Sequence, residues 1–225
     1  IDSPVRIRLS SIEPTEFSDA LVDFIAETPR ICPHFHIPLQ SGDPEILKRM
    51  RRPYSPEFFA RRLETFKRRL PDAAIGVDVL IGFPGESETA FRNTCELIDS
   101  LPVSYLHIFP YSPRPPAPAA RYPNPVSPPE IKRRCKIMHE LADAKKAFFY
   151  RQMCEKTLDV LIEEPLDAGA SGFTGLSENY IPVCIQQPGL TVNTRMPCYV
   201  TDADGDRHVT GIPAFSHTPH PGAVC

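Results

Sequence analysis

The chain has 225 residues, of which 41% are hydrophobic and 24% charged, and its formal net charge is −3. This composition is typical of a soluble globular protein and excludes collagen-like and intrinsically disordered classes. The sequence contains no apolar run of the roughly 20 residues that a membrane-spanning helix requires, so we expect no membrane partner.

The first half of the chain alternates strand-like runs with helical patterns. The runs are Val5–Ser10, His34–Leu39, Ile75–Gly82 and Tyr105–Pro110. Strands alternating with helices favour βα units and a parallel sheet. The chain enters its first strand-like run almost at once after Ile1, so we expect it to be part of a longer protein.

Three predicted helix starts carry N-capping chemistry. Asp43 and Ser55 each stand directly before a proline, which places a capping side chain ahead of a preorganised first helical residue. Ser127 opens a capping box with Glu130, and a long basic helix is predicted to follow. The proline-rich stretch that precedes Ser127 favours an extended loop, because proline lacks an N–H group.

The pattern changes to short β runs separated by glycine, asparagine and aspartate after about residue 152. The runs are Leu158–Glu163, Ser171–Gly175, Tyr180–Ile185, Met196–Thr201 and Arg207–Gly211. Such a series predicts a small all-β barrel. We therefore expect four parts: a partial barrel of parallel strands over 1–126, a connecting helix over 127–153, the β module over 154–212 and a disordered tail over 213–225.

The cysteines are scattered along the chain and never lie two or three residues apart. This spacing predicts neither a metal site nor an iron–sulfur cluster ligated by this chain. Scattered cysteines in an ordinary composition favour reduced thiols and a cytoplasmic location over a disulfide framework.

The alternation of side chains along each predicted strand separates an apolar face from a polar one. The polar face collects Arg8, Ser10, His36, Gln40, Asp78 and His107. One interpretation is an internal ion pair between Arg8 and Asp78, with the histidines satisfied by hydrogen bonds. The set as a whole favours a polar ligand, because an unfilled polar interior is costly to desolvate.

The carboxyl ends of these strands lead into loops rich in glycine and proline. Ligands bind at this end of parallel sheets, and glycine lets the backbone approach them closely. The loops are Pro38–Asp43, Gly82–Glu86 and Pro110–Arg114. Three such loops in register predict a binding site at the strand ends.

Five stretches of the chain form a recognisable set of motifs: Arg6–Pro14, His34–Asp43, Leu47–Met50, Asp78–Glu86 and His107–Ser112. Together they resemble the motifs of the radical S-adenosylmethionine (SAM) methylthiotransferases, and in particular the type that modifies threonylcarbamoyladenosine beside the tRNA anticodon. The resemblance implies a radical SAM barrel whose last four strands are present here. It also implies that the β module is a TRAM domain, an RNA-binding barrel.

The resemblance implies SAM as cofactor and 4Fe-4S clusters in the intact protein, ligated by residues outside this chain. In the family, cleavage of SAM produces the radical that activates the adenine carbon, so this chain alone is expected to be inactive. The motifs point to a cofactor site that contains Arg8, Ser10, His36, Gln40, Ser41, Asp78, Gly82 and Glu86. An alternative for Glu86 is that it stabilises the following helix N-terminus.

The distribution of charge favours the first part of the chain as the RNA-binding surface. Basic residues concentrate between Lys48 and Arg69, whereas the β module is acidic, and phosphate binding requires lysine and arginine. The residues predicted to bind tRNA are Arg51, Arg52, Arg61, Arg62 and Arg114. Two alternatives stay open: the related activity on a ribosomal-protein aspartate, and a tRNA-binding chain without catalysis. The sequence does not indicate the electron donor.

Overall fold

The computed structural model describes residues 5–169 and 171–214. The chain divides into two compact units, Ile1–Lys145 and Lys146–Cys225, and each is described by itself. The division falls within the long helix α5 (Pro128–Arg151). The predicted disordered tail lies outside the described residues from 215 onward.

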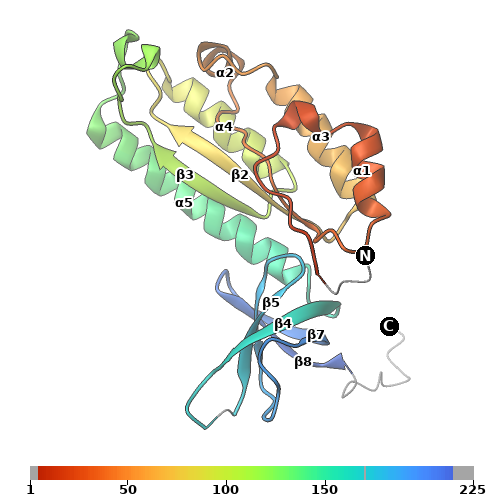
Figure 1. Cartoon of the computed structure of the whole chain (residues 1–225). Coiled ribbons are helices and arrows are strands. Elements are labelled where there is room, and N and C mark those ends of the chain that lie inside the picture. The colour runs from red at the N-terminus through yellow and green to blue at the C-terminus, as the bar shows by residue number, and fades with distance from the viewer. Residues whose placement is uncertain (1–4, 170, 215–225) are drawn as a thin grey trace, which may run out of the picture. The chain divides into compact units, whose positions relative to one another are not determined.

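A three-stranded parallel sheet in the order β1-β2-β3 forms the centre of the first unit (Figure 1). The strands are β1 (His34–His36), β2 (Ala74–Ile81) and β3 (Tyr105–Pro110). Phe35 pairs with Ile75 across the first strand pair, and Asp78 pairs with His107 across the second. The predicted α/β class with parallel strands is confirmed.

The prediction of a strand at Val5–Ser10 is wrong. This segment makes one isolated parallel bridge, between Ile7 and Ile31, and the Ile7 N–H donates to the Arg30 carbonyl at 2.7 Å. Val5 and Ile7, which belong to the apolar side of the predicted alternation, are 57% and 45% exposed. The apolar side chains of an alternating segment are buried only where a continuous ladder of hydrogen bonds holds the segment in register over the core. The single bridge at Ile7 does not hold this segment in such a register.

Strand β1 ends at His36, earlier than predicted, because Pro38 cannot donate to the ladder. Pairing resumes at Gln40, whose N–H donates to the Asp78 carbonyl at 2.8 Å. Gln40 has a φ of 68°, a left-handed conformation that is uncommon for a residue with a side chain. The chain therefore turns sharply at the carboxyl end of this strand.

The residues that the structure describes include five α-helices and two short 3-10 helices. Besides α5 these are η1 (Pro14–Glu16), α1 (Asp19–Ala26), α2 (Pro44–Arg49), α3 (Pro56–Arg69), α4 (Glu88–Ser100) and η2 (Pro118–Arg121). The predicted caps of α2 and α3 are confirmed: Asp43 accepts from the Glu45 and Ile46 N–H groups, and Ser55 accepts from Phe58. Together these caps contribute about 1–2 kcal/mol to helix stability.

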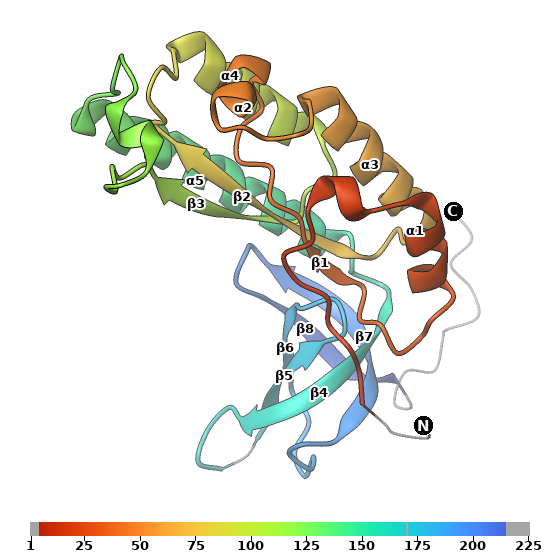
Figure 2. The same ribbon diagram turned by 45° about the horizontal axis from the view of Figure 1, so that its top comes forward.

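The helices bury one face of the sheet, and Figure 2 shows α3 and α4 above the strands and α5 behind them. Apolar side chains on this face of β1 and β2 are almost fully buried against helix residues. The cluster includes Phe35, Ile37, Ile75, Val77, Val79, Ile81, Phe59, Leu63, Phe66, Ile98 and Met138. Each such side chain stabilises the fold by about 1.5–3 kcal/mol relative to exposure. The helices thereby leave the opposite face of the strands for polar groups.

The second unit contains a closed five-stranded barrel in the order β4-β5-β6-β8-β7. Its strands are β4 (Thr157–Pro165), β5 (Phe173–Ser177), β6 (Pro182–Ile185), β7 (Arg195–Asp204) and β8 (His208–Pro213). Alternate residues such as Val160, Ile162, Val183 and Val209 fill the interior and are at most 1% exposed. The predicted all-β barrel is confirmed. Among the described helices, none is long and apolar enough to cross a membrane.

Candidate functional site

The sheet face opposite the helices carries a cluster of aromatic and titratable side chains. As the period of two predicts, the residues that share this face are His34, His36, Gly76, Asp78, Leu80, Tyr105, His107 and Phe109. The sequence placed His36, Asp78 and His107 on one face, and the structure brings them into contact. This cluster is the polar face described below.

Asp78 is the centre of the polar face. Its Oδ1 atom lies 2.8 Å from His36 Nε2 and 3.3 Å from His107 Nδ1. The two imidazole rings are 5.0 Å apart between centroids, and Ser11 Oγ lies 3.4 Å from the other nitrogen of His36. The side chain of Asp78 is 18% exposed and that of His107 is 51% exposed. Small molecules and ions in solution can therefore reach the cluster.

His34 and Tyr105 form a second pair beside Asp78. His34 Nε2 lies 2.7 Å from Tyr105 Oη, and the two rings stack with centroids 5.7 Å apart. Gly76 makes this arrangement possible, because a Cβ atom there would lie 2.1 Å from Tyr105 Cζ. Burial lowers the pKa of His34 to about 4, with a further contribution from the positive charge of Arg8. His34 is therefore neutral at neutral pH.

The low pKa of His34 predicts a loss of stability in mild acid. The pKa is about 4 in the folded chain and 6.5 ordinarily, so the unfolded chain binds the proton first as the pH falls. The free energy of unfolding should therefore decrease between about pH 6.5 and about pH 4, by about 2–3 kcal/mol in total. Urea unfolding of the wild type and of His34→Gln, followed by circular dichroism, measures the difference. An identical pH dependence in the two proteins would contradict the prediction.

Arg8 and Ser10 occupy the segment before the sheet. The charge of Arg8 acts on His34, which places Arg8 near the polar face, and its side chain is half-buried. Ser10 is exposed, and it is the neighbouring Ser11 that contacts His36. Of the two predicted residues, the structure therefore brings only Arg8 toward the cluster.

A buried ion pair organises the loop after β2. Glu86 Oε2 accepts hydrogen bonds from the Gly82 N–H and from Arg134 Nη1, both at 2.8 Å. The Glu86 and Arg134 side chains are only 1% and 5% exposed. Gly82 itself has a φ of 83°, and a Cβ atom there would lie 2.4 Å from Ile131. Glu86 thus holds the glycine turn in place through its carboxylate.

Ser41 similarly fastens the loop after β1 to helix α4. Its hydroxyl lies 3.3 Å from Thr94 Oγ1, which also accepts from the Gly42 N–H at 2.9 Å. Asn93 donates to Asp43 at 2.8 Å, and Ser41 is 1% exposed. Ser41 and Glu86 are therefore supports of the strand-end loops, whereas Gln40 borders open space.

A cavity of about 280 Å³ opens beside the strand ends. Its lining includes Gln40, Arg49, Arg51, Arg52 and Tyr122. The Arg49 guanidinium lies 5.7 Å from the Tyr122 ring centroid, and Arg52 pairs with Glu13 at 2.8 Å. Three guanidinium groups next to an aromatic ring suit an anionic ligand with a planar group, such as a nucleotide. This surface is called the arginine cavity below.

The other predicted tRNA-binding arginines lie on different elements. Arg61 and Arg62 belong to helix α3, where Arg62 pairs with Asp19 at 2.6 Å and lies over the Phe58 ring. Arg114 is exposed in the loop after β3. The lining of the arginine cavity includes Arg51 and Arg52 from the predicted set, but not these three.

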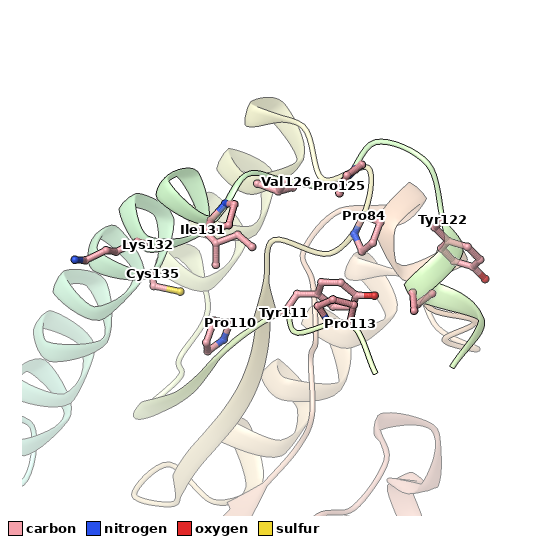
Figure 3. A pocket seen from close by; sticks show the side chains of 13 residues that line it. Pro84, Pro110, Tyr111, Pro113, Tyr122, Pro125, Val126, Ile131, Lys132 and Cys135 are labelled. Carbon is pink, nitrogen blue, oxygen red and sulfur yellow. The ribbon is translucent and has the colours of Figure 1, made fainter. Parts of the chain in front are cut away.

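A larger, apolar cavity of about 700 Å³ lies between the end of β3, the proline-rich loop and the start of α5 (Figure 3). Tyr111, Pro113, Ile131 and Cys135 are among its lining residues, and Lys132 is the charged one. The Tyr111 hydroxyl is buried and has no hydrogen-bond partner among the described residues. A ligand with an apolar group and one hydrogen-bond acceptor would complement this lining.

The described cysteines do not form a cluster site. All six described cysteines are free thiols, of which two are buried and four are partly buried. Within residues 5–169 and 171–214, three potential metal-ligand side chains converge at one place, formed by His36, Asp78 and His107. This group contains no cysteine. The cysteines in this part of the chain therefore do not fit a 4Fe-4S cluster, whose irons require several thiolates.

Comparison with known proteins identifies the relatives of this chain. The family model of the radical SAM superfamily matches residues 2–98. Over 185 residues the chain is 37% identical to the threonylcarbamoyladenosine tRNA methylthiotransferase MtaB of Bacillus subtilis, covering 81% of this chain and 41% of the relative. The resemblance to radical SAM methylthiotransferases is confirmed.

Two tRNA-2-methylthio-N(6)-dimethylallyladenosine synthases are similarly related to this chain. That of Corynebacterium urealyticum is 37% identical over 73% of this chain and 30% of its own length. The enzyme of Desulfitobacterium hafniense is 32% identical, and the match covers 91% of this chain and 46% of that relative. The chain thus spans less than half the length of each of these relatives.

A solved structure supports the radical SAM fold. Coproporphyrinogen III oxidase (HemN) from Escherichia coli, described as a radical SAM enzyme, superposes with a TM-score of 0.54 and 12% identity. The match covers 77% of this chain and 46% of that one. At this identity the likeness concerns the fold alone.

Several residues of the site are absent from the set of site residues that the sequence predicted. Arg134 and Tyr122 are distant in sequence from the residues they contact, so no local motif indicated them. His107 was recognised on the polar face by strand alternation, but the resemblance did not assign it a role. Its contact with Asp78 depends on the pairing of β2 with β3, which the sequence does not specify residue by residue.

Proposed function

We propose that this chain carries SAM-facing and tRNA-facing surfaces of a tRNA methylthiotransferase. The intact enzyme would add a methylthio group to carbon 2 of threonylcarbamoyladenosine beside the anticodon. The observation that carries this proposal is the polar face of β1, β2 and β3, which leads at the strand ends into the arginine cavity. Named relatives that modify tRNA adenosines add independent support.

In this proposal SAM lies at the carboxyl ends of the strands. Gln40 borders the arginine cavity, and the left-handed turn at Gly82 follows β2 at the same end of the sheet. Ser41 and Glu86 hold the two loops, His36 and Asp78 border the site from the polar face, and Arg8 does so from the segment before the sheet. The exposed Ser10 lies outside this set. SAM supplies the radical and methyl chemistry when it is bound, and the residues of this chain orient it.

The reductive step belongs to groups outside the described residues. The converging side chains in this part of the chain do not include the thiolates that a 4Fe-4S cluster requires. We therefore assign no cluster ligand and no electron-transfer role here, and the electron donor is left open. The proposed contribution of this chain is recognition and positioning.

The proposed tRNA surface is the arginine cavity. Arg49, Arg51 and Arg52 concentrate positive charge beside Tyr122, and this combination binds phosphates and stacks on bases. Arg61, Arg62 and Arg114 would extend the contact over neighbouring elements. The barrel, which is acidic in sequence, would contribute less.

A second candidate substrate is dimethylallyladenosine in tRNA. The chain is equally identical to a relative named for that nucleoside, and the lining of the 700 Å³ cavity is mostly apolar. An apolar dimethylallyl group suits proline and tyrosine walls, whereas a threonyl carboxylate would have to use Lys132. The ribosomal-protein aspartate and a tRNA-binding role without catalysis are further alternatives.

Mass spectrometry of tRNA nucleosides tests these alternatives. Deleting the gene that encodes the chain should abolish methylthio-threonylcarbamoyladenosine and leave its unmodified precursor. Loss of methylthio-dimethylallyladenosine instead would establish the second substrate. Unchanged levels of both nucleosides would refute the proposed function. Complementation with the intact gene controls for effects on neighbouring genes.

A further inference from the structure

The side chains of His36, Asp78 and His107 are arranged as the ligands of a metal ion could be. The three side chains come from three adjacent parallel strands and project from the same face. Their ligand atoms, His36 Nε2, one Asp78 carboxylate oxygen and His107 Nδ1, all lie within 4.8 Å of one another. Two of the separations are 2.8 and 3.3 Å. Nitrogen atoms of both histidines therefore converge on one carboxylate oxygen of Asp78.

We propose that this cluster is a binding site for a divalent transition-metal ion of the zinc type. In a tetrahedral zinc site with bonds of about 2.0–2.1 Å, donor atoms are separated by roughly 3.3–3.5 Å. The observed separations require shifts of only a few tenths of an ångström along two edges. The cysteine spacing gave no indication of this site, because none of its ligands is a cysteine.

The chemistry of the donors favours zinc or a neighbouring first-row metal. Two imidazoles and one carboxylate suit Zn²⁺ and Fe²⁺ and leave at least one position open, whereas Mg²⁺ and Ca²⁺ prefer oxygen ligands. Asp78 supplies a negative charge, so the bound ion and its three ligands would carry a net charge of +1. The half-exposed side chain of His107 leaves the ion a path from solution.

The surroundings of His36 also match a metal ligand. Its Nε2 atom points to Asp78, while its Nδ1 atom lies 3.4 Å from the hydroxyl of Ser11. Metal-bound histidines commonly use the second ring nitrogen in such a hydrogen bond, which fixes the tautomer and the ring orientation. Metal binding would move the His36 proton from Nε2 to Nδ1, where it can be donated to Ser11.

The ligands of the metal site precede the strand-end loops in the chain. His36 is the last residue of β1, and Asp78 and His107 each lie three residues before the ends of β2 and β3. Gln40 and Gly82, four residues beyond His36 and Asp78, remain at the proposed cofactor end. The coordination position that the three ligands leave open can accept a water molecule or a ligand atom.

Cobalt and zinc titrations of the reduced, metal-free full chain test the site. Co²⁺ should bind with a stoichiometry of one and produce visible d–d absorption without a thiolate charge-transfer band. Calorimetry with Zn²⁺ should show affinity at least about tenfold lower for each of His36→Gln, Asp78→Asn and His107→Gln. The exposed His139 on α5 provides the matched control, because His139→Gln should bind as the wild type does.

The proposal is overturned if the wild-type chain binds neither metal, if thiolate absorption dominates, or if the three variants retain wild-type affinity. Circular dichroism shows whether the variants fold. If a variant does not fold, imidazole NMR of the wild type decides: Zn²⁺ should shift the His36 and His107 resonances and leave those of His139 unchanged. None of these readouts depends on SAM or tRNA, so failure of the proposed function would leave this result intact.

Discussion

Replacing Arg134 with methionine is expected to lower the free energy of unfolding by about 3–5 kcal/mol. The guanidinium is 5% exposed and donates to Glu86, both at the carboxylate and at the backbone carbonyl. Arg134→Met leaves the buried Glu86 carboxylate without its cation, and a buried unpaired charge is strongly destabilising. Urea unfolding followed at 222 nm measures the loss, because the long helices lie mainly in the first unit.

Two further variants make this experiment specific. The double variant Glu86→Gln/Arg134→Met removes both charges and should recover part of the lost stability. The neighbouring Arg133 is the matched control, since its half-exposed side chain also pairs with two carboxylates, Glu88 and Glu130. Arg133→Met should cost much less, because exposed ion pairs are weak. Equal losses at the two arginines would show that burial of the Glu86 pair is not what stabilises the loop.

Reversing the charges of Arg51 and Arg52 is expected to weaken tRNA binding at least tenfold and to reduce its salt dependence. If each arginine neutralises one phosphate, the slope of log K against log salt should decrease by about 2. Both side chains line the arginine cavity, and Arg51 is exposed there. Fluorescence anisotropy with labelled tRNA at several salt concentrations measures affinity and slope together.

Controls on other surfaces decide where the tRNA lies. The variant Arg61→Glu/Arg62→Glu should have a smaller effect, because Arg62 is already paired with Asp19. Arg207→Glu reverses a charge of the barrel, where the side chain is 74% exposed and pairs with Asp204. If only the barrel variant weakens binding, the tRNA surface belongs to the barrel and not to the arginine cavity. Thermal unfolding of each variant excludes a general loss of structure, which matters for Arg52 because it pairs with Glu13.

The sequence by itself determined the elements whose signals are local. Proline after Asp43 and Ser55 predicted two helix starts, and short strand-like runs predicted β2, β3 and the barrel strands. Alternation along the predicted strands placed His36, Asp78 and His107 on one face, because side chains of a strand point to opposite sides. It failed at Val5–Ser10, where the apolar pattern is present but only a single bridge forms.

The tertiary structure alone decided which of these residues meet. The parallel pairing of β1, β2 and β3 brings two histidines to one oxygen of Asp78, although they are far apart in sequence. Helix α5 carries Arg134 to Glu86 across a long sequence separation, and Glu86, a residue predicted at the cofactor site, also fixes the loop after β2. Such contacts depend on register and packing over long sequence distances, which local propensity does not encode.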